Sequence, residues 1–319
     1  MITLFKLSRV RLLSKGYCVS LLVTGSIGID TVKTPYGVSE ECLGGSAVYF
    51  AMAASFFGLV RFVGVVGADC PFDFEKLFAG RNVDLAGLEI RRNSKTFRWH
   101  GTYHENMDDR TTDYLELNVL AEHPPKIPQA FKDSKFVFLA NTTPRLQLEL
   151  LEQLTQPTFV GADTMNHWIE GHGGDLKNLL KKIDCLIINE DEARLLGKDY
   201  NLIKASQNII DMGVGVLIIK KGESGSMTYT RHKELFLLPA YPAGQVKDPT
   251  GAGDSFAGGL MGCLAETGRT DFATLKKAVA YGTVVASFAI ADFSLNGLTA
   301  INRADIDNRL QALRKLTHF

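Results

Sequence analysis

The chain alternates between short apolar runs rich in β-branched residues and longer stretches with helical spacing. The predicted strands are residues 19–24, 60–66, 135–140, 158–162, 185–189 and 214–220. The predicted helices are residues 46–58, 144–154, 190–197, 201–213, 255–265, 271–290 and a last helix from Arg303. Strands that alternate with helices form a mainly parallel sheet covered on both faces. The sequence therefore predicts an α/β fold that binds its ligands at the carboxyl ends of the strands.

Two segments, residues 30–37 and 95–117, interrupt this alternation. Both have a period of two, with aromatic and polar residues on opposite faces, which is typical of half-exposed antiparallel strands. They are expected to form either a small sheet that covers a site or an ordinary surface hairpin. The pattern alone does not separate these two alternatives.

Composition excludes several classes of protein. The 319 residues include 35 basic and 35 acidic side chains, so the net charge gives no reason to expect a nucleic-acid partner. No apolar run approaches the roughly 20 residues that a membrane span needs. Five cysteines are scattered without a CxxC pair, which favours reduced thiols in a cytoplasmic protein. A soluble cytoplasmic protein with a small-molecule ligand is the expectation.

The first 18 residues contain basic and apolar residues in mixed order and no acidic residue. They have no continuous apolar core and no small-residue cleavage site, so they fit a secretory signal poorly. We expect residues 1–18 to be a dispensable extension and residues 19–319 to form one domain.

The stretch KDPTGAGDSFAGGL, residues 247–260, predicts a loop that enters the N-terminus of a helix. Small residues let backbone amides approach a ligand, and a helix N-terminus favours an anion such as phosphate. Asp254 is unexpected there, because a carboxylate repels an anion. It suits a general base that faces the group attacking a phosphate. The alternative is a simple helix cap.

Other motifs for nucleotide, metal and hydrolase chemistry are missing from the sequence. The P-loop pattern, GxGxxG, HExxH and GxSxG do not occur, and GSIG at residues 25–28 is only a fragment of a dinucleotide turn. His100 and His104 lie on a predicted strand, where a solvated face is the commoner reason for such a pair than a metal site.

The sequence DPTGAGDSFAGG resembles the second signature of the PfkB, or ribokinase-like, carbohydrate kinases. LGGSAVYFAMAASFFG at residues 43–58 is similar to the first signature, INEDE at 188–192 to the family's NxxE, and KKGESG at 220–225 to its nucleotide-side glycine turn. The resemblance runs from about residue 19 to residue 317. It implies a ribokinase-like three-layer α/β/α sandwich with a mainly parallel central sheet. Lid segments at about 30–42 and 95–118 would form a small antiparallel β lid.

The resemblance also implies a reaction. The γ-phosphate of Mg-ATP would be transferred to a primary hydroxyl of a sugar or sugar-like molecule, with ATP and Mg²⁺ as cofactors and K⁺ as a further candidate. Asp254 would accept the proton of the attacking hydroxyl. The amides of Gly251, Ala252 and Gly253 would stabilise the developing charge.

Further positions take their roles from the family. The nucleotide-binding residues would be Asn189, Glu192, Lys221, Gly222, Gly225, Thr250 and Gly282. Asn189 and Glu192 would hold Mg²⁺ through water, although a capping pair for the helix at 190–197 explains them as well. Lys221 would neutralise a phosphate oxygen or be simply solvated, and Asp248 would lie beside a monovalent cation.

The substrate-binding residues implied by the resemblance are Asp30, Gly44, Gly45 and Asn166. Departures from the ribokinase pattern, with Gly28 in place of an asparagine and GGSAVYF in place of GGKGxN, argue against ribose. Trp99, Tyr103 and Tyr114 in the lid segments are candidates for stacking on a sugar or a base.

Two alternatives to a sugar kinase therefore stay open. One is a nucleoside kinase, and the other is a non-catalytic sugar or nucleotide sensor, which has no need of Asp254. The family's lid often pairs with a second subunit, so a homodimer through the lid is also an expectation.

Overall fold

The computed structural model describes residues 20–318, so the predicted extension, residues 1–18, lies outside the described residues. Within residues 20–318 the strands form two sheets. The larger, called the main sheet below, has nine strands in the order β13-β12-β11-β10-β9-β8-β1-β4-β5, and the smaller, called the lid sheet, has four in the order β3-β2-β6-β7. The predicted α/β architecture with a small second sheet is confirmed.

The main sheet is parallel from β5 to β11 and antiparallel at β12 and β13. Its strands are β1 (Leu21–Thr24), β4 (Val60–Gly67), β5 (Val83–Arg91), β8 (Phe136–Leu139), β9 (Phe159–Ala162), β10 (Cys185–Asn189), β11 (Val216–Lys220), β12 (Ser226–Thr230) and β13 (Leu235–Leu238). The six predicted strands match β1, β4, β8, β9, β10 and β11. The sequence analysis did not find β5, β12 and β13, which lie toward the two edges of the sheet.

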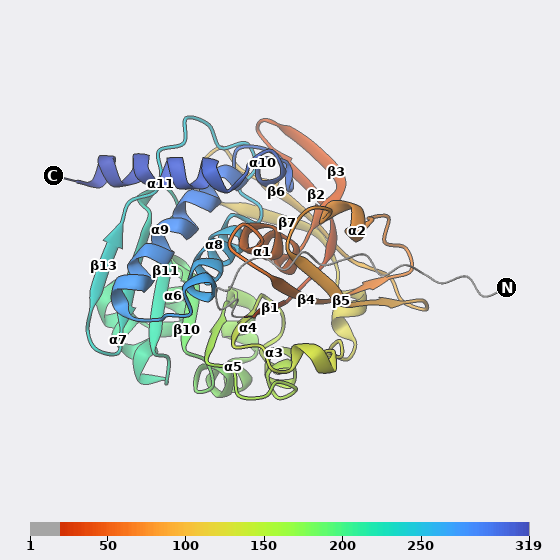
Figure 1. Cartoon of the computed structure of the whole chain (residues 1–319), viewed down its shortest axis with the longest axis horizontal. Helices are drawn as coiled ribbons and strands as arrows, with labels where there is room; N and C mark the ends of the chain where they lie inside the picture. Colours follow the sequence, from red (N-terminus) through yellow and green to blue (C-terminus); the bar gives the residue numbers. More distant parts are fainter. Residues whose placement is uncertain (1–19, 319) are drawn as a thin grey trace.

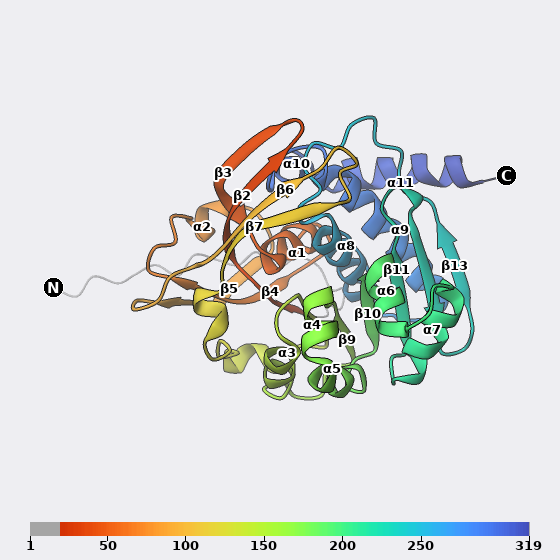
Figure 2. The same ribbon diagram turned by 180° about the vertical axis from the view of Figure 1, so that it is seen from behind.

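Helices cover both faces of the main sheet and complete the three layers (Figures 1 and 2). They are α1 (Ser46–Ala54), α2 (Phe74–Leu77), α3 (Pro144–Leu151), α4 (Asn166–Gly171), α5 (Gly173–Leu180), α6 (Glu190–Gly197), α7 (Leu202–Asp211), α8 (Ala252–Thr267), α9 (Phe272–Ala289), α10 (Asn296–Thr299) and α11 (Arg303–Thr317). Two apolar clusters fill the space between the layers. One contains side chains of α1, α8, α9 and α11, and the other contains side chains of α3, α5, α6 and α7.

Glycines inside α8 and α9 allow close helix packing. A methyl group on Gly258 would lie 2.5 Å from the carbonyl oxygen of Phe50 in α1, and one on Gly282 would lie 2.6 Å from that of Phe256 in α8. The buried position of Gly282 is accounted for by the contact between α8 and α9. Its part in nucleotide binding stays a prediction.

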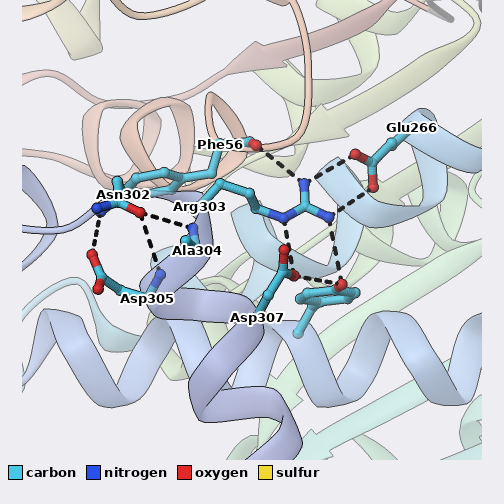
Figure 3. Close-up of polar contacts among 8 residues, drawn as sticks. Phe56, Glu266, Asn302, Arg303, Ala304, Asp305 and Asp307 are labelled. Atoms are coloured by element: carbon cyan, nitrogen blue, oxygen red, sulfur yellow. Dashed lines mark hydrogen bonds and ion pairs between the residues drawn. The ribbon is translucent and has the colours of Figure 1, made fainter.

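Arg303 fastens α11 to the helices beside it (Figure 3). Its guanidinium donates to the carbonyl oxygen of Phe56 at 3.1 Å and to both carboxylate oxygens of Glu266 at 3.0 and 3.2 Å. The same group lies 4.4 Å from the centre of the Phe57 ring. Asn302 caps the helix through the amides of Ala304 and Asp305. These contacts fix the predicted start of the last helix at Arg303.

The lid sheet consists of β2 (Gly28–Thr34), β3 (Gly37–Gly44), β6 (Phe97–Tyr103) and β7 (Arg110–Glu116), in agreement with the predicted lid segments. It is a mixed sheet, because β2 runs parallel to β6, whereas the sequence analysis expected antiparallel pairing. The Tyr103 hydroxyl lies 3.4 Å from Thr250 Oγ1, just before α8. The two segments therefore form one four-stranded sheet that contacts the start of α8, and the role of this sheet as a lid stays a prediction.

Two findings concern the helices and the cysteines of the described residues. No helix within residues 20–318 combines the length and apolarity that a membrane crossing requires. Cys42, Cys70, Cys185 and Cys263 are free thiols, and Cys18 lies outside the described residues.

Candidate active site

Three polar side chains lie at the carboxyl edge of the main sheet. Asp163 directly follows β9, Asn189 ends β10 and Lys220 ends β11, where it is the register partner of Asn189. The apolar parts of these strands are buried on both sides, so polar residues first occur where the strands end. The N-terminus of α8 and the lid sheet complete this edge, the place where parallel sheets bind ligands.

The N-terminus of α8 is shaped by glycine. Gly251 is the N-cap residue with φ of 72°, and the ring of Tyr49 occupies the space that a side chain at this position would need. The Ala252 amide donates to the carbonyl oxygen of Pro249 at 3.1 Å. Among the described residues, the amides of Gly251 and Gly253 have no backbone acceptor outside regular elements. Of the predicted anion-binding amides, these two are therefore available for a ligand.

Asp254 lies in the first turn of α8 and is half-buried. Burial raises its pKa, and the positive charges of Lys220 and Arg110 oppose that rise. A carboxylate with a raised pKa accepts a proton more readily than an exposed one. The simple capping alternative has no support here, because the N-cap is Gly251 and no side-chain cap bond is present at this helix end.

Asp30 projects from β2 of the lid sheet and is buried, with 4% of its surface exposed. A methyl group on Gly44 would overlap its carboxylate, so Asp30 needs the glycine of β3 beside it. Burial, together with the charges of Asp248 and Asp254, raises the pKa of Asp30 to about 7, and the Gly45 amide opposes the rise. Asp30 and Asp254, from the lid and from α8, are therefore close enough to repel each other.

The inner face of the lid sheet carries two of the three predicted aromatic residues. Trp99 is the register partner of Asp30, and its ring lies over Gly101 and donates from Nε1 to Thr112 at 3.2 Å. Tyr103 points the same way and meets Thr250. Tyr114 instead lies on the outer face with its ring 5.0 Å from that of His100. Trp99 and Tyr103 therefore lie on the face of the lid sheet that carries Asp30, and Tyr114 lies on the opposite face.

Arg110, the first residue of β7, is the register partner of Tyr103 on the inner face of the lid sheet. Its positive charge lowers the pKa values of Asp254 and Glu192 against the effect of burial. The sequence analysis did not identify it, because an exposed arginine at the end of a half-polar strand has no distinguishing local pattern.

Asn189 and Glu192 form a reciprocal capping box at α6. Asn189 Oδ1 accepts the Glu192 amide and Glu192 Oε2 accepts the Asn189 amide, both at 2.8 Å. The capping alternative is therefore confirmed for these side chains. Glu192 is nevertheless buried with a raised pKa, and the box uses only one of its two carboxylate oxygens.

The turn after β11 contains Lys221, Gly222 and Gly225. Both glycines have positive φ, at 50° and 91°, and the Lys221 amide donates to the carbonyl oxygen of Gly225 at 2.7 Å. A methyl group on Gly222 would lie 3.0 Å from Asp108 Oδ1 in the β6–β7 turn. The lid sheet therefore also contacts the turn that follows β11 of the main sheet. Lys220 extends to the α8 terminus, where a methyl group on Gly253 would lie 2.5 Å from its Nζ.

Two predicted site residues differ in accessibility. Asp248 is 1% exposed, and its carboxylate accepts the amides of Thr250 at 2.8 Å and Ser294 at 3.2 Å. Asn166 starts α4 at the end of the loop after β9 and is exposed. Asp163, three residues earlier, is buried, and its Oδ1 has no hydrogen-bond partner in the described residues. Asn166 was predicted from this loop and its role stays a prediction. Asp163 was not singled out, although a carboxylate directly after an apolar strand is a usable signal.

Sequence comparison identifies the family to which this chain belongs. Residues 32–299 match the pfkB family of carbohydrate kinases. The chain belongs to this family. It is therefore a phosphotransferase with a hydroxyl group as acceptor, and the family's members act on sugars or nucleosides.

Relatives and solved structures agree with this assignment. A cytidine kinase of Thermococcus kodakarensis is 28% identical over 250 residues, which cover 76% of this pfkB-family chain and 87% of that protein. A Burkholderia thailandensis nucleoside kinase in complex with inosine has a TM-score of 0.73 at 22% identity and covers 92% of this chain and 98% of that one. An Arabidopsis thaliana ribokinase complexed with ribose and ATP has a TM-score of 0.75 at 18% identity, covering 92% and 99%. The expected ribokinase-like fold is confirmed.

Proposed function

We propose that this pfkB-family kinase transfers the γ-phosphate of Mg-ATP to a primary hydroxyl of a nucleoside. The observation that carries the proposal is the placement of Asp254. This carboxylate lies in the first turn of α8 beside two available amides, and its charge contributes to the raised pKa of Asp30 in the lid sheet. A base and an anion-binding helix end at one place suit the two ends of an in-line phosphoryl transfer.

Asp30 is the proposed anchor for the sugar ring of the substrate. Its buried carboxylate accepts hydrogen bonds, and Gly44 and Gly45 leave the backbone beside it free of side chains. Two vicinal hydroxyls bound there would leave the primary hydroxyl free to reach Asp254. Asp254 takes the proton as the hydroxyl oxygen attacks phosphorus, and ADP is the leaving group.

Trp99 supports a nucleoside over a free sugar. Its ring lies on the inner face of the lid sheet next to Asp30, where a base attached to a bound ribose can stack. The cytidine kinase relative, matched over 76% of this chain, supports the same choice. A free pentose is the second candidate, favoured by the ribokinase that has this fold and binds ribose.

The residues at the edge of the main sheet fit a magnesium ion. Asp163 and Glu192 are buried carboxylates with raised pKa values, and each has an oxygen that no hydrogen bond uses among the described residues. Hard cations such as Mg²⁺ prefer oxygen ligands of this kind. We propose that Asp163 and Glu192, with Asn189, hold Mg²⁺ partly through water. The ion would neutralise charge on the phosphates.

A monovalent cation near Asp248 is part of the same proposal. Asp248 is buried, and its charge contributes to the raised pKa of Asp30. A bound K⁺ would offset this repulsion, so activity is expected to rise with K⁺ at constant ionic strength. Equal activity in K⁺ and in tetramethylammonium would contradict the proposed cation site near Asp248.

A lid-to-lid homodimer is a separate proposal. Val38 and Tyr114 on the outer face of the lid sheet and Tyr36 in the turn before β3 are all at least 44% exposed, which is unusual for large apolar side chains so close together. Sedimentation of the wild type and of Val38→Glu tests it. A dimer that dissociates in the variant supports the interface, and a monomeric wild type contradicts it.

The proposed reaction is tested with purified protein, Mg-ATP and K⁺ against cytidine, inosine, adenosine, ribose and fructose. Nucleoside phosphorylation at least ten times more efficient than pentose phosphorylation supports the proposal. Preferred turnover of a free sugar would overturn the substrate class and leave the kinase reaction intact. ATP binding without turnover of any acceptor would instead favour the sensor.

A further inference from the structure

Gln147 of α3 is a fully buried glutamine. Its side-chain Nε2 donates to the carbonyl oxygens of Leu139 at 2.8 Å, Ala140 at 3.3 Å and Asp163 at 3.1 Å. The two hydrogens of this amide are therefore shared among three acceptors. Because burying an amide costs free energy unless it is hydrogen-bonded, these three bonds are what keep Gln147 in the core.

The three carbonyl groups lie where two neighbouring strands end. β8 and β9 are paired up to Leu139 and Ala162, and the chain beyond these residues leaves the main sheet. Buried carbonyl groups that lose their partners in a sheet need others. The short loop of residues 140–143 leads directly into α3, so that Gln147, the fourth residue of the helix, reaches back to these carbonyl groups.

Asp163 is the site residue whose position depends on this contact. It is buried, and its Oδ1 has no hydrogen-bond partner in the described residues. Burial and the charge of Asp254 raise the pKa of Asp163 well above its usual range. Because Oδ1 is held by no other group, the direction of the carboxylate is set mainly by the backbone of Asp163. Gln147 holds that backbone through the carbonyl oxygen.

Buried polar atoms without a partner are concentrated at this point. Within residues 20–318 there are eight such side-chain oxygens, and four of them belong to Thr142, Gln147, Asp163 and Thr164. Both threonines lie within two residues of a carbonyl group that Gln147 binds. Polar atoms of this kind indicate a place for water or an ion, since other buried polar groups are paired within the protein. The ends of β8 and β9 therefore form a polar site whose backbone is fixed by one side chain.

We propose that Gln147 is a positioning residue that holds the Asp163 carboxylate in the direction that a metal ion at the phosphates requires. The inference rests on the proposed function, in which Asp163 is one of the residues that hold Mg²⁺. Gln147 acts through the backbone of Asp163 and contacts neither the ion nor the substrates. Loss of a partner behind a metal ligand typically lowers metal affinity about 10- to 100-fold.

Two glutamines provide a matched pair of variants. Gln147→Met keeps the approximate length and volume of the side chain and removes its donor. Gln153, in the turn after α3, also makes three hydrogen bonds to backbone groups, those of Pro125, Ile127 and Glu149, none of which belongs to the candidate site. Gln153→Met is therefore the control. We expect both variants to lower the thermal midpoint by a few degrees, because each loses hydrogen bonds to the backbone.

Amide hydrogen exchange tests the structural part of the inference without any ligand. In Gln147→Met we expect residues 139–142 and 163–165 to exchange about tenfold faster than in the wild type, because their carbonyl groups lose a partner. Gln153→Met should leave the exchange of these segments unchanged. If Gln147→Met does not fold, Gln147→Glu replaces it, since a carboxyl group protonated by burial keeps one donor. Unchanged exchange in the folded variant would overturn the inference.

The affinity for ADP with and without Mg²⁺ tests the functional part and needs neither an acceptor nor turnover. Calorimetric titrations with ADP in MgCl₂ and in EDTA give the factor by which Mg²⁺ strengthens ADP binding. We expect this factor to fall about tenfold in Gln147→Met and to change by less than about threefold in Gln153→Met. The affinity in EDTA should be nearly the same in the wild type and both variants.

The outcomes separate this inference from the proposed function. No change of the factor in Gln147→Met, or an equal change in both variants, would show a merely structural role and overturn the inference. A wild type whose ADP affinity does not respond to Mg²⁺ would also overturn it. If the wild type responds to Mg²⁺ but phosphorylates no acceptor, the proposed function fails, and the comparison of the two variants still decides the role of Gln147.

Discussion

The main sheet and the lid sheet both consist of β-strands, but the strands of the two sheets differ in how far they are buried. Strands β1, β8 and β9 of the main sheet are buried at every residue, whereas the first six residues of β7 in the lid sheet are exposed. A buried parallel strand can present polar side chains only at its end, as with Lys220. A half-exposed strand can present them along its inner face, as with Asp30 and Trp99. In the proposed reaction the main sheet would therefore supply the phosphate side of the site, and the lid sheet would supply the acceptor side.

Among the variants that compare the two sheets, the largest effect is expected at Gly251, the residue that shapes the N-terminus of α8. Gly251→Ala forces a side chain onto a residue with φ of 72° and into the ring of Tyr49. We expect kcat to fall at least 10³-fold, because the α8 terminus must shift away from Asp254. Gly80→Ala is the matched control, since Gly80 has a similar φ of 75° with nothing within 4 Å of the added methyl group. Equal losses in both variants would show that the Tyr49 contact is irrelevant.

Arg110 tests whether the inner face of the lid sheet takes part in chemistry. Removing its charge with Arg110→Gln should lower kcat about 10- to 100-fold, because a cation near Asp254 and the phosphates is lost. Lys33→Gln is the control, since Lys33 is an exposed lid residue that points outward. Steady-state kinetics at saturating ATP measure the difference. Similar kcat values for the two variants would show that Arg110 takes no part in the chemical step.

Substitution of Trp99 tests whether the lid sheet contacts the base of a nucleoside. Trp99→Leu should raise KM for a nucleoside about tenfold and leave KM for free ribose nearly unchanged, because stacking on a base is worth roughly 1–3 kcal/mol. Tyr114→Leu, on the outer face, should leave both values unchanged. The chain has 2 tryptophans, so Trp168→Phe isolates the fluorescence of Trp99. We expect cytidine to quench the fluorescence of Trp99 and ribose to leave it unchanged. Equal quenching by the two compounds would argue against stacking.

The smallest effect concerns the acidity of Asp30. Because its pKa is raised from 3.8 to about 7, the folded state binds more protons than the unfolded state between these values. The contribution of Asp30 to stability is therefore present at low pH and is lost as pH rises through about 7. We expect Asp30→Asn to raise the thermal midpoint by a few degrees at pH 8 and to change it little at pH 4, in K⁺-free buffer. The same shift at both pH values would exclude this linkage.

Sequence patterns predicted the two halves of the molecule to different extents. The strands of the main sheet were found because their apolar runs are continuous, and the helix at 190–197 was found with its bounds because Asn189 and Glu192 form a capping box. The strands β12 and β13 were missed, and the parallel pairing of β2 with β6 was not predicted, because pairing depends on contacts between distant segments.

The helix terminus at the candidate site could be predicted from a local motif, whereas the side chains at the ends of the strands could not. DPTGAGD identified the α8 terminus directly. Lys221 was predicted from its place before Gly222, and its role stays a prediction. Lys220, the last residue of β11, was not singled out, because the three buried residues before it give no alternation from which to predict where its side chain points. Asp163, Lys220 and Arg110 come together from β9, β11 and β7, and only the folded chain brings them to one place.

The most direct test of the account is the turnover of Asp254→Asn with Mg-ATP and the best nucleoside acceptor, beside its ATP affinity. Asparagine fills nearly the same volume and cannot accept the proton, so we expect ATP binding within a few-fold of the wild type and a kcat lower by about 10⁴ or more. A folded Asp254→Asn enzyme with a kcat within tenfold of the wild type would contradict the assignment of Asp254 as the general base.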